Sequence, residues 1–207
     1  MNVRKLKEAE RRFLIKYPGG FLHPELQAIG KKHAMSRRIA YAQEAFAKDR
    51  FKQPQQIVDS AITLISQSSV VSLFEKPKFR DYLRTLSGEE RQAFVDHLKA
   101  LLHGDLAKGF EGLVAVLRRG KIAKWPILTA FLIYYRPDSE VFIKPTTAKN
   151  VIAFFELDAL HYSPTPSYAF YRDFRESLLA MKAKVSPDLA PSNAAFSGFL
   201  MMSTRPE

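Results

Sequence analysis

The chain has 207 residues, of which 46% are hydrophobic and 26% are charged. This is ordinary globular composition and allows one large domain or one domain with a helical arm. There is no cysteine, so disulfides, thiolate metal sites and cysteine nucleophiles are excluded. The formal net charge of +11 favours phosphates, acidic protein surfaces or anionic lipid as partners.

Hydropathy indicates a soluble protein of the cytoplasm with no membrane partner. The longest apolar stretch, residues 127–135, is much shorter than the roughly 20 residues of a membrane-spanning helix. Residues 1–20 are charged and lack the apolar centre of a secretory signal.

Helical periodicity runs through nearly the whole chain. It predicts the following helices in chain order: residues 3–16, residues 24–48 with a break near Ser36, residues 54–65, a short helix near 77–82, and then residues 88–102, 106–117, 126–135, 146–157 and 167–182. Two N-caps are clear, because Ser87 with Glu90 forms a capping box and Asp105 precedes the next apolar run. Gly109 and Gly112 weaken the helix that follows Asp105.

Two segments depart from this pattern. Residues 140–144 are expected to be extended, and the apolar, proline-punctuated residues 187–202 are expected to pack back on the body. We therefore expect an all-α fold with a single multi-helix globular domain over residues 54–207. A basic helical N-terminal region, residues 1–53, precedes it. Whether the two form one continuous folded unit stays open.

Charge is unevenly distributed along the chain. Residues 1–50 carry twelve Lys and Arg against five Asp and Glu, so their net charge of +7 is most of the total. The helices predicted there present a basic face, formed by Lys31, Lys32, Arg37 and Arg38.

A second basic group lies in a loop between two helices. Four cations, Arg118, Arg119, Lys121 and Lys124, surround Gly120. Glycine permits a tight turn with exposed N–H groups, and the helix that begins near Trp125 or Pro126 directs its positive end at the same space. The loop therefore either binds a phosphate or is a solvated connection between helices.

Further candidates are less specific. Lys144 and Lys149 flank Thr146 and Thr147 at a helix start, which suits a phosphate, although capping by one of the threonines explains the pattern better. Trp125 and five tyrosines could stack on bases, although aromatic residues at helical spacing are usually core.

Enzymatic signatures are missing. The five histidines show no metal-ligand spacing, and neither nucleotide-binding glycine pattern occurs, so no metal and no cofactor is expected. Asp138 and Glu140, the acids nearest the basic loop, are expected to cap and solvate a turn rather than to move protons.

Residues 122–127, followed by residues 141–143, resemble helix-hairpin-helix DNA glycosylases of the alkyladenine type. The resemblance covers about 35 of the 207 residues. In that family the hairpin rests on the DNA backbone, and a later segment carries the catalytic aspartate. The resemblance thus implies a helix-hairpin-helix-like fold and contact with DNA.

Three departures remove the chemistry of that family. Ala123 stands where the hairpin glycine is expected, and Pro126 interrupts the start of the following helix. The catalytic aspartate would fall near Pro145 or Thr146, neither of which is acidic. What remains is a DNA-backbone clamp without glycosylase activity. Separately, parts of residues 124–168 resemble a group of uncharacterised bacterial proteins, which implies no activity.

The leading hypothesis is a non-enzymatic nucleic-acid-binding protein, with DNA favoured, that contacts phosphates through the basic helices and the basic loop. One alternative is a divergent base-flipping repair enzyme, with Asp138 or Lys144 at the mouth of a pocket. Another is a helical module that docks an acidic protein. The docking module predicts an exposed apolar patch beside the basic helices, whereas phosphate binding predicts few exposed aliphatic side chains there.

Overall fold

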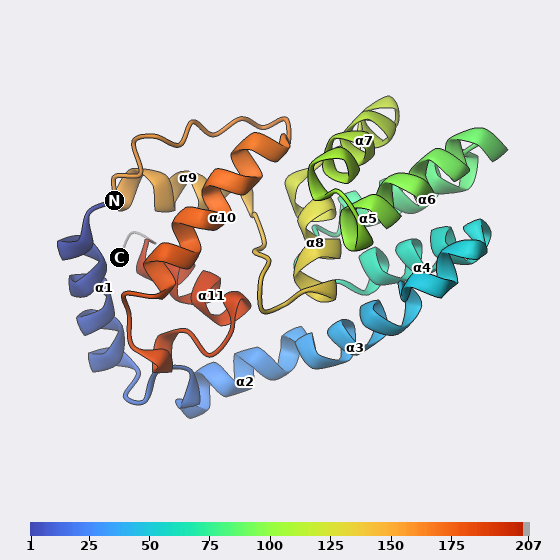
Figure 1. The fold of residues 1–207 in the computed structure, drawn as a ribbon. Coiled ribbons are helices and arrows are strands. Elements are labelled where there is room, and N and C mark those ends of the chain that lie inside the picture. Colours follow the sequence, from blue (N-terminus) through green and yellow to red (C-terminus); the bar gives the residue numbers. More distant parts are fainter. Residues whose placement is uncertain (205–207) are drawn as a thin grey trace.

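In the computed structural model, which describes residues 1–204, the chain forms α-helices joined by short 3₁₀-helices and loops (Figure 1). The α-helices are α1 (Val3–Lys16), α2 (Pro24–His33), α3 (Met35–Ala45), α4 (Pro54–Gln67), α5 (Glu75–Thr85), α6 (Gly88–His103), α7 (Leu106–Arg119), α8 (Trp125–Tyr135), α9 (Pro145–Phe154), α10 (Tyr168–Lys182) and α11 (Asn193–Ser203). The 3₁₀-helices are η1 (Gly20–Leu22), η2 (Lys48–Lys52) and η3 (Pro187–Leu189). No strand occurs in residues 1–204, which confirms the expected all-α class.

Local capping sets several helix boundaries where the sequence predicts them. The Ser87 Oγ accepts from the Glu90 N–H at 3.2 Å, and Glu90 Oε2 accepts from the Ser87 N–H at 3.1 Å. Asp105 Oδ1 accepts from the Lys108 N–H at 3.1 Å. These bonds satisfy backbone donors that a helix start leaves unpaired.

The predicted helix over residues 24–48 divides at Ala34, two residues before the expected break. Ala34 has a φ of +46°, a left-handed conformation that alanine adopts only at a cost of about 1–2 kcal/mol. After the break, α3 packs against α8 and α4, so its surroundings differ from those of α2. Most of α2 is exposed, with only Leu26 buried.

Residues 140–144 form no strand, so their backbone is held by side chains instead. The Ile143 N–H donates to Thr129 Oγ1 at 3.1 Å, and the Val141 N–H donates to the Tyr171 hydroxyl at 3.3 Å. The segment therefore lies between α8 and α10.

Helix α8 forms the centre of the molecule, since all its residues from Trp125 to Tyr134 are buried. Figure 1 shows α4, α5, α6 and α7 on one side of it and α1, α9, α10 and α11 on the other, with α2 and α3 along one edge. No helix in the described part of the chain is long and apolar enough to cross a bilayer.

The glycines of α7 permit its close packing on α6. A Cβ at Gly109 would lie 2.1 Å from the Leu101 nitrogen, and one at Gly112 would lie 2.1 Å from the His97 ring. The residues that weakened the helix prediction thus have a packing role.

The N-terminal region packs on α8 itself and on neighbouring parts of the C-terminal half. The Asn2 N–H donates to the Phe155 carbonyl at 2.7 Å, and the Phe13 ring lies 5.2 Å from that of Phe199 in α11. At the end of α3, the Phe46 ring lies 5.9 Å from Phe131 in α8. The C-terminal residues also pack back on the body, because α11 contacts α1, α9 and α10.

Candidate nucleic-acid interface

The end of α2 and the start of α3 lie against the connection between α4 and α5. His33 Nδ1 and Ser69 Oγ form a hydrogen bond of 3.0 Å. Arg38 donates to the Gln67 carbonyl at 3.0 Å and to Gln67 Oε1 at 2.7 Å. These contacts place the junction of α2 and α3 beside the end of α4 and the segment that leads to α5.

The first turn of α5 adds positive charge at this place. Burial lowers the pKa of Lys76, and the nearby charge of Arg38 lowers it further. Burial raises the pKa of Glu75, while the Ser72 backbone and the charges of Lys124 and Lys78 act in the opposite direction. Charges from α3 and from the loop before α8 thus act on the first turn of α5: Arg38 acts on Lys76, and Lys124 acts on Glu75.

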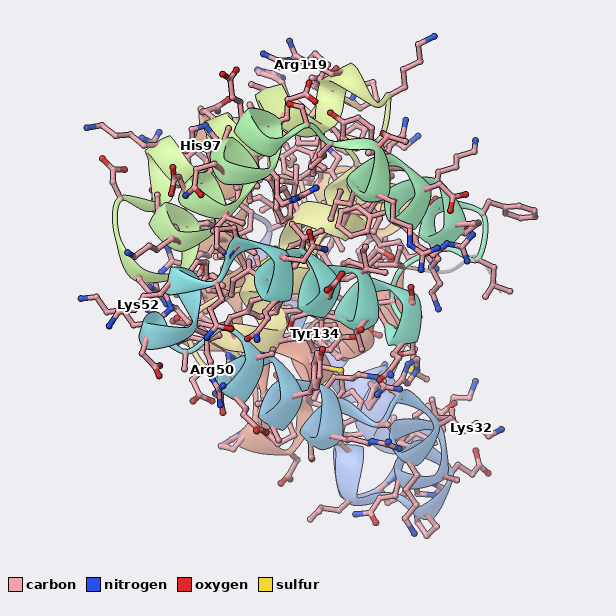
Figure 2. All side chains as sticks on the ribbon, turned by 90° about the vertical axis from the view of Figure 1, so that its right-hand side faces the viewer. Lys32, Arg50, Lys52, His97, Arg119 and Tyr134 are labelled. Carbon is pink, nitrogen blue, oxygen red and sulfur yellow. The ribbon has the colours of Figure 1, made fainter. Side chains whose placement is uncertain are left out.

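We call these residues the basic surface: Lys31, Lys32, Arg37, Arg38, Lys76, Lys78 and Lys124. Arg38 and Lys76 are half-buried and the other five are exposed. Within residues 1–204 none of the seven belongs to an ion pair with a carboxylate. Figure 2 shows the Lys32 side chain directed away from the body of the molecule. Five of these residues were candidates from the sequence, whereas Lys76 and Lys78 were not.

The rest of the predicted basic loop is arranged differently. Arg119 pairs with Glu90 at 3.4 Å and lies far from Lys32 in Figure 2, while Arg118 is exposed at the end of α7. Gly120 has a φ of −84°, so the left-handed residue of the turn is Lys121, with a φ of +55°. Gly120 is needed for space, because a Cβ there would lie 2.4 Å from the Tyr82 ring.

The backbone of this loop offers little to a phosphate. The Lys121 N–H donates to the Arg118 carbonyl at 2.9 Å, and the Ile122 N–H donates to the Leu117 carbonyl at 3.0 Å. At the start of α8, Pro126 has no N–H, and the Ile127 N–H donates to the Lys124 carbonyl at 3.1 Å. The expected cradle of free N–H groups is therefore absent from residues 121, 122, 126 and 127.

Trp125 is a core residue, which corrects its assignment to nucleic-acid binding. Its ring is 1% exposed, and its Nε1 donates to the Ser163 carbonyl at 2.8 Å. Tyr134 and Tyr171 are buried as well. A ring that packs in the core cannot stack on a base.

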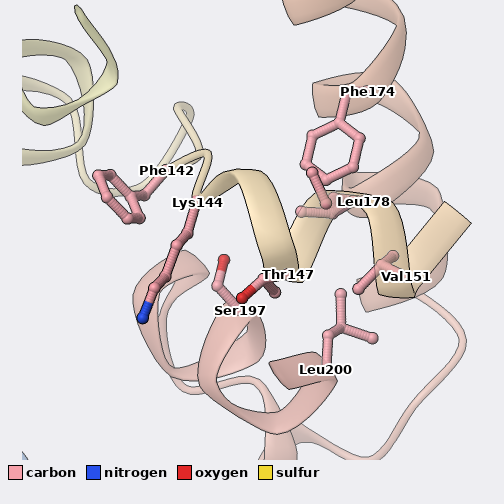
Figure 3. A pocket seen from close by; sticks show the side chains of 9 residues that line it. Phe142, Lys144, Thr147, Val151, Phe174, Leu178, Ser197 and Leu200 are labelled. Carbon is pink, nitrogen blue, oxygen red and sulfur yellow. The ribbon is translucent and has the colours of Figure 1, made fainter. Parts of the chain in front are cut away.

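Lys144 and Lys149 belong to a different part of the surface, on α9. Lys144 occupies the N-cap position without a side-chain hydrogen bond there, so neither Thr146 nor Thr147 caps this helix as expected. Lys144 and Thr147 line a cavity of about 10 Å³, which has room for about one water molecule (Figure 3). Lys149 Nζ lies 5.8 Å from the centre of the Tyr162 ring.

Glu140 is 2% exposed, which corrects the expectation that it solvates a turn. The Tyr171 hydroxyl donates to Glu140 Oε2 at 2.7 Å, and Arg175 Nε lies 3.4 Å from the same oxygen. Burial and the adjacent carboxylate raise the pKa of Tyr171 well above its usual value. Asn193 Nδ2 donates to the carbonyls of Asp138 and Glu140 at 3.1 and 2.9 Å. This network joins α10 and α11 to the segment before α9.

The larger hollows do not suit an anion or a flipped base. One of about 360 Å³ is lined by Asp158, Asp173 and Glu176 among other residues, so its charge is negative. Another, of about 220 Å³, lies between α3, α4 and η2. Neither is lined by Asp138 or Lys144, the two candidates for base-flipping chemistry. No group of three potential metal ligands occurs in the described residues.

The sequence also left unrecognised an exposed apolar pair, Leu73 and Phe74, next to the basic surface. Their side chains are 77% and 83% exposed. The Ser72 Oγ accepts from the Phe74 N–H at 3.2 Å, and the Ser72 carbonyl accepts from the Glu75 and Lys76 N–H groups. The spacing of Ser72 and Glu75 is that of a capping box and could have located this turn.

The chain matches no known protein family, no curated protein and no solved structure. These comparisons do not test the resemblance to helix-hairpin-helix glycosylases, which stays a prediction from about 35 residues of the sequence.

Proposed function

We propose that this protein is a non-enzymatic nucleic-acid-binding protein that contacts DNA phosphates through the basic surface. The observation that carries the proposal is the position of Arg38 and Lys76 on either side of the connection between α4 and α5: Arg38 donates to Gln67 at the end of α4, and the Lys76 N–H donates to the Ser72 carbonyl. Burial lowers the pKa of Lys76, and the nearby charge of Arg38 lowers it further. A phosphate between such groups would relieve their repulsion and release counterions from the DNA. Phosphate contacts confer affinity but little sequence preference.

The distribution of ion pairs supports this choice of surface. In α1, Lys7 pairs with Glu10 at 2.8 Å and Arg11 pairs with Glu8 at 2.8 Å. Lys5 and Arg12 also lie within 4 Å of a carboxylate, so four of the six cations of α1 have an acidic partner. The cations at the end of α2 and the start of α3 have no such carboxylate partner in the described residues, so they remain available to an anion.

Fluorescence anisotropy with a random-sequence DNA duplex at several salt concentrations tests the proposal. The test variant is Lys31→Gln, Lys32→Gln, Arg37→Gln, and the control is Lys52→Gln, Lys99→Gln, Lys184→Gln, which removes the same charge from other exposed positions. The test variant should bind more weakly, and the slope of log K against log salt should become shallower by about 0.9 for each phosphate that the variant no longer neutralises. The proposal would be overturned if the wild type left the anisotropy of both this duplex and a single strand of the same length unchanged at low salt, or if both variants weakened binding equally.

The exposed apolar pair favours a second candidate, a module that docks an acidic protein, because such a module should show an apolar patch beside its basic helices. A random copolymer of glutamate and tyrosine is a suitable probe. If it binds the wild type and loses affinity for Leu73→Ala, Phe74→Ala, while the DNA duplex does not bind, the docking module is the better account.

A further inference from the structure

Phe74 is exceptional among the phenylalanines of this chain. The chain has sixteen, and the other fifteen are buried or half-buried. Exposing a ring of this size forgoes roughly 1.5–3 kcal/mol of burial free energy, so the exposure has no benefit for the stability of the fold. An exposed aromatic side chain beside a charged surface indicates a place where a partner binds.

The backbone that carries the ring is fixed by hydrogen bonds. Phe74 is the N-cap of α5, with φ −78° and ψ −23°, and its N–H donates to Ser72 Oγ. The Ser72 carbonyl accepts from the N–H groups of Glu75 at 3.0 Å and Lys76 at 3.2 Å. Because the turn is already formed, binding through the ring would require little further ordering of the backbone.

The surroundings of the ring point to a polyanion. Lys76 and Lys78 follow in the same chain segment, and Arg38 acts on Lys76 from α3. An acidic peptide helix would need an apolar groove, but Leu73 and Phe74 line none of the three hollows described above. A lipid surface requires a broad apolar face, whereas here only two neighbouring side chains are offered. A single ring can stack on a base without a pocket.

We infer that this protein recognises nucleic acid with unpaired bases, with the Phe74 ring stacked on one base while the basic surface holds the adjacent phosphates. The inference deepens the proposed function and rests on it. Since every base has a flat π face, the preference would be for unpaired structure and not for a particular sequence.

The test compares three fluorescein-labelled DNA probes of equal length: a thymidine single strand, a strand of the same charge built from abasic tetrahydrofuran units, and a duplex. The wild type should bind the thymidine strand about tenfold more tightly than the abasic strand. Phe74→Ala should abolish this difference and leave the affinity for the abasic strand unchanged. Phe74→Tyr should keep it. Leu22→Ala, at a side chain 72% exposed, is the matched control and should bind like the wild type.

The outcomes separate this inference from the proposed function. If the wild type binds the thymidine and abasic strands equally, the stacking role is wrong and phosphate binding stands. If none of the three probes binds at low salt, both are wrong. If Phe74→Ala lowers binding to vesicles of anionic lipid but not to the thymidine strand, the apolar pair serves a membrane surface instead. Circular dichroism should show unchanged folding of Phe74→Ala, since the side chain is 83% exposed.

Discussion

Glu75 is an acidic side chain within the basic surface, and its surroundings do not suit a charged carboxylate. Its Oε2 is buried without a hydrogen-bond partner in the described residues. Burial raises the pKa of the carboxyl, and the opposing effects of the Ser72 backbone, Lys124 and Lys78 are smaller. The charged form is therefore less favourable in the folded protein than in the unfolded chain.

Replacing Glu75 with glutamine should stabilise the protein at pH 7. The pKa of Glu75 is higher in the folded protein than in the unfolded chain, so folding favours the protonated carboxyl. The protein is therefore most stable with respect to this group below the unfolded pKa, and it loses that stability as the pH rises through the folded pKa. The advantage of Glu75→Gln should thus shrink as the pH falls through the raised folded pKa, and it should be gone once the pH is below the ordinary value of 4.5. Urea unfolding at pH 7 and pH 4 measures this, with Glu44→Gln at an exposed carboxylate as the control. A variant that is less stable than the wild type at pH 7 would contradict the argument.

Among the helices, the boundaries that the sequence predicted well are those with a local cause. Ser87, Glu90 and Asp105 cap helices by bonds to backbone groups three residues away, and such bonds depend only on neighbouring residues. A break was expected near Ser36, but its position at Ala34 could not be predicted, because alanine is a strong helix former and only tertiary packing holds it at a positive φ. Residues 140–144 show an extended pattern, but whether a partner strand exists is decided elsewhere in the chain.

The loop between α7 and α8 is positioned by its contact with α5. The Tyr82 hydroxyl donates to the Val116 carbonyl at 2.7 Å, and its ring covers Gly120. Gly120→Ala should destabilise the protein by about 1–3 kcal/mol, because the added Cβ would overlap a ring that this hydrogen bond restrains. Gly88→Ala places its Cβ in open space and should change the free energy of unfolding by no more than about 0.5 kcal/mol. Equal effects of the two substitutions in urea unfolding would show that the contact with Tyr82 is unimportant.

For the molecule as a whole, the sequence revealed how much positive charge there is but not where it gathers. Arg38 acts on Lys76 because α3 and α5 both contact α4, and the charge of Lys124, just before α8, acts on Glu75. The residues of each pair lie far apart in the sequence, so their proximity is known only once the helices are packed. Packing also places Trp125 and Glu140 in the interior, whereas the sequence made Trp125 a candidate for nucleic-acid binding and Glu140 a residue that solvates a turn.

The contact of α3 with α8 bears on whether residues 1–53 and the rest unfold together. The Phe46 side chain is fully buried against Phe131, and His103 Nε2 lies 2.8 Å from the Phe46 carbonyl oxygen. Replacement of such a phenylalanine with alanine should lower the free energy of unfolding by about 3–5 kcal/mol. Trp125 is the only tryptophan and lies in α8, so its fluorescence follows the centre of the molecule, while circular dichroism follows all helices.

If the chain is one cooperative unit, Phe46→Ala should move the urea transition seen by both signals to the same lower concentration. Phe74→Ala, which also removes a phenyl ring but from an exposed site, should leave both transitions in place. A fluorescence transition that does not move while the helix signal disappears earlier would mean that residues 1–53 unfold independently. In that case the basic surface, which draws on α2, α3 and α5, would be divided between two units and would depend on their docking.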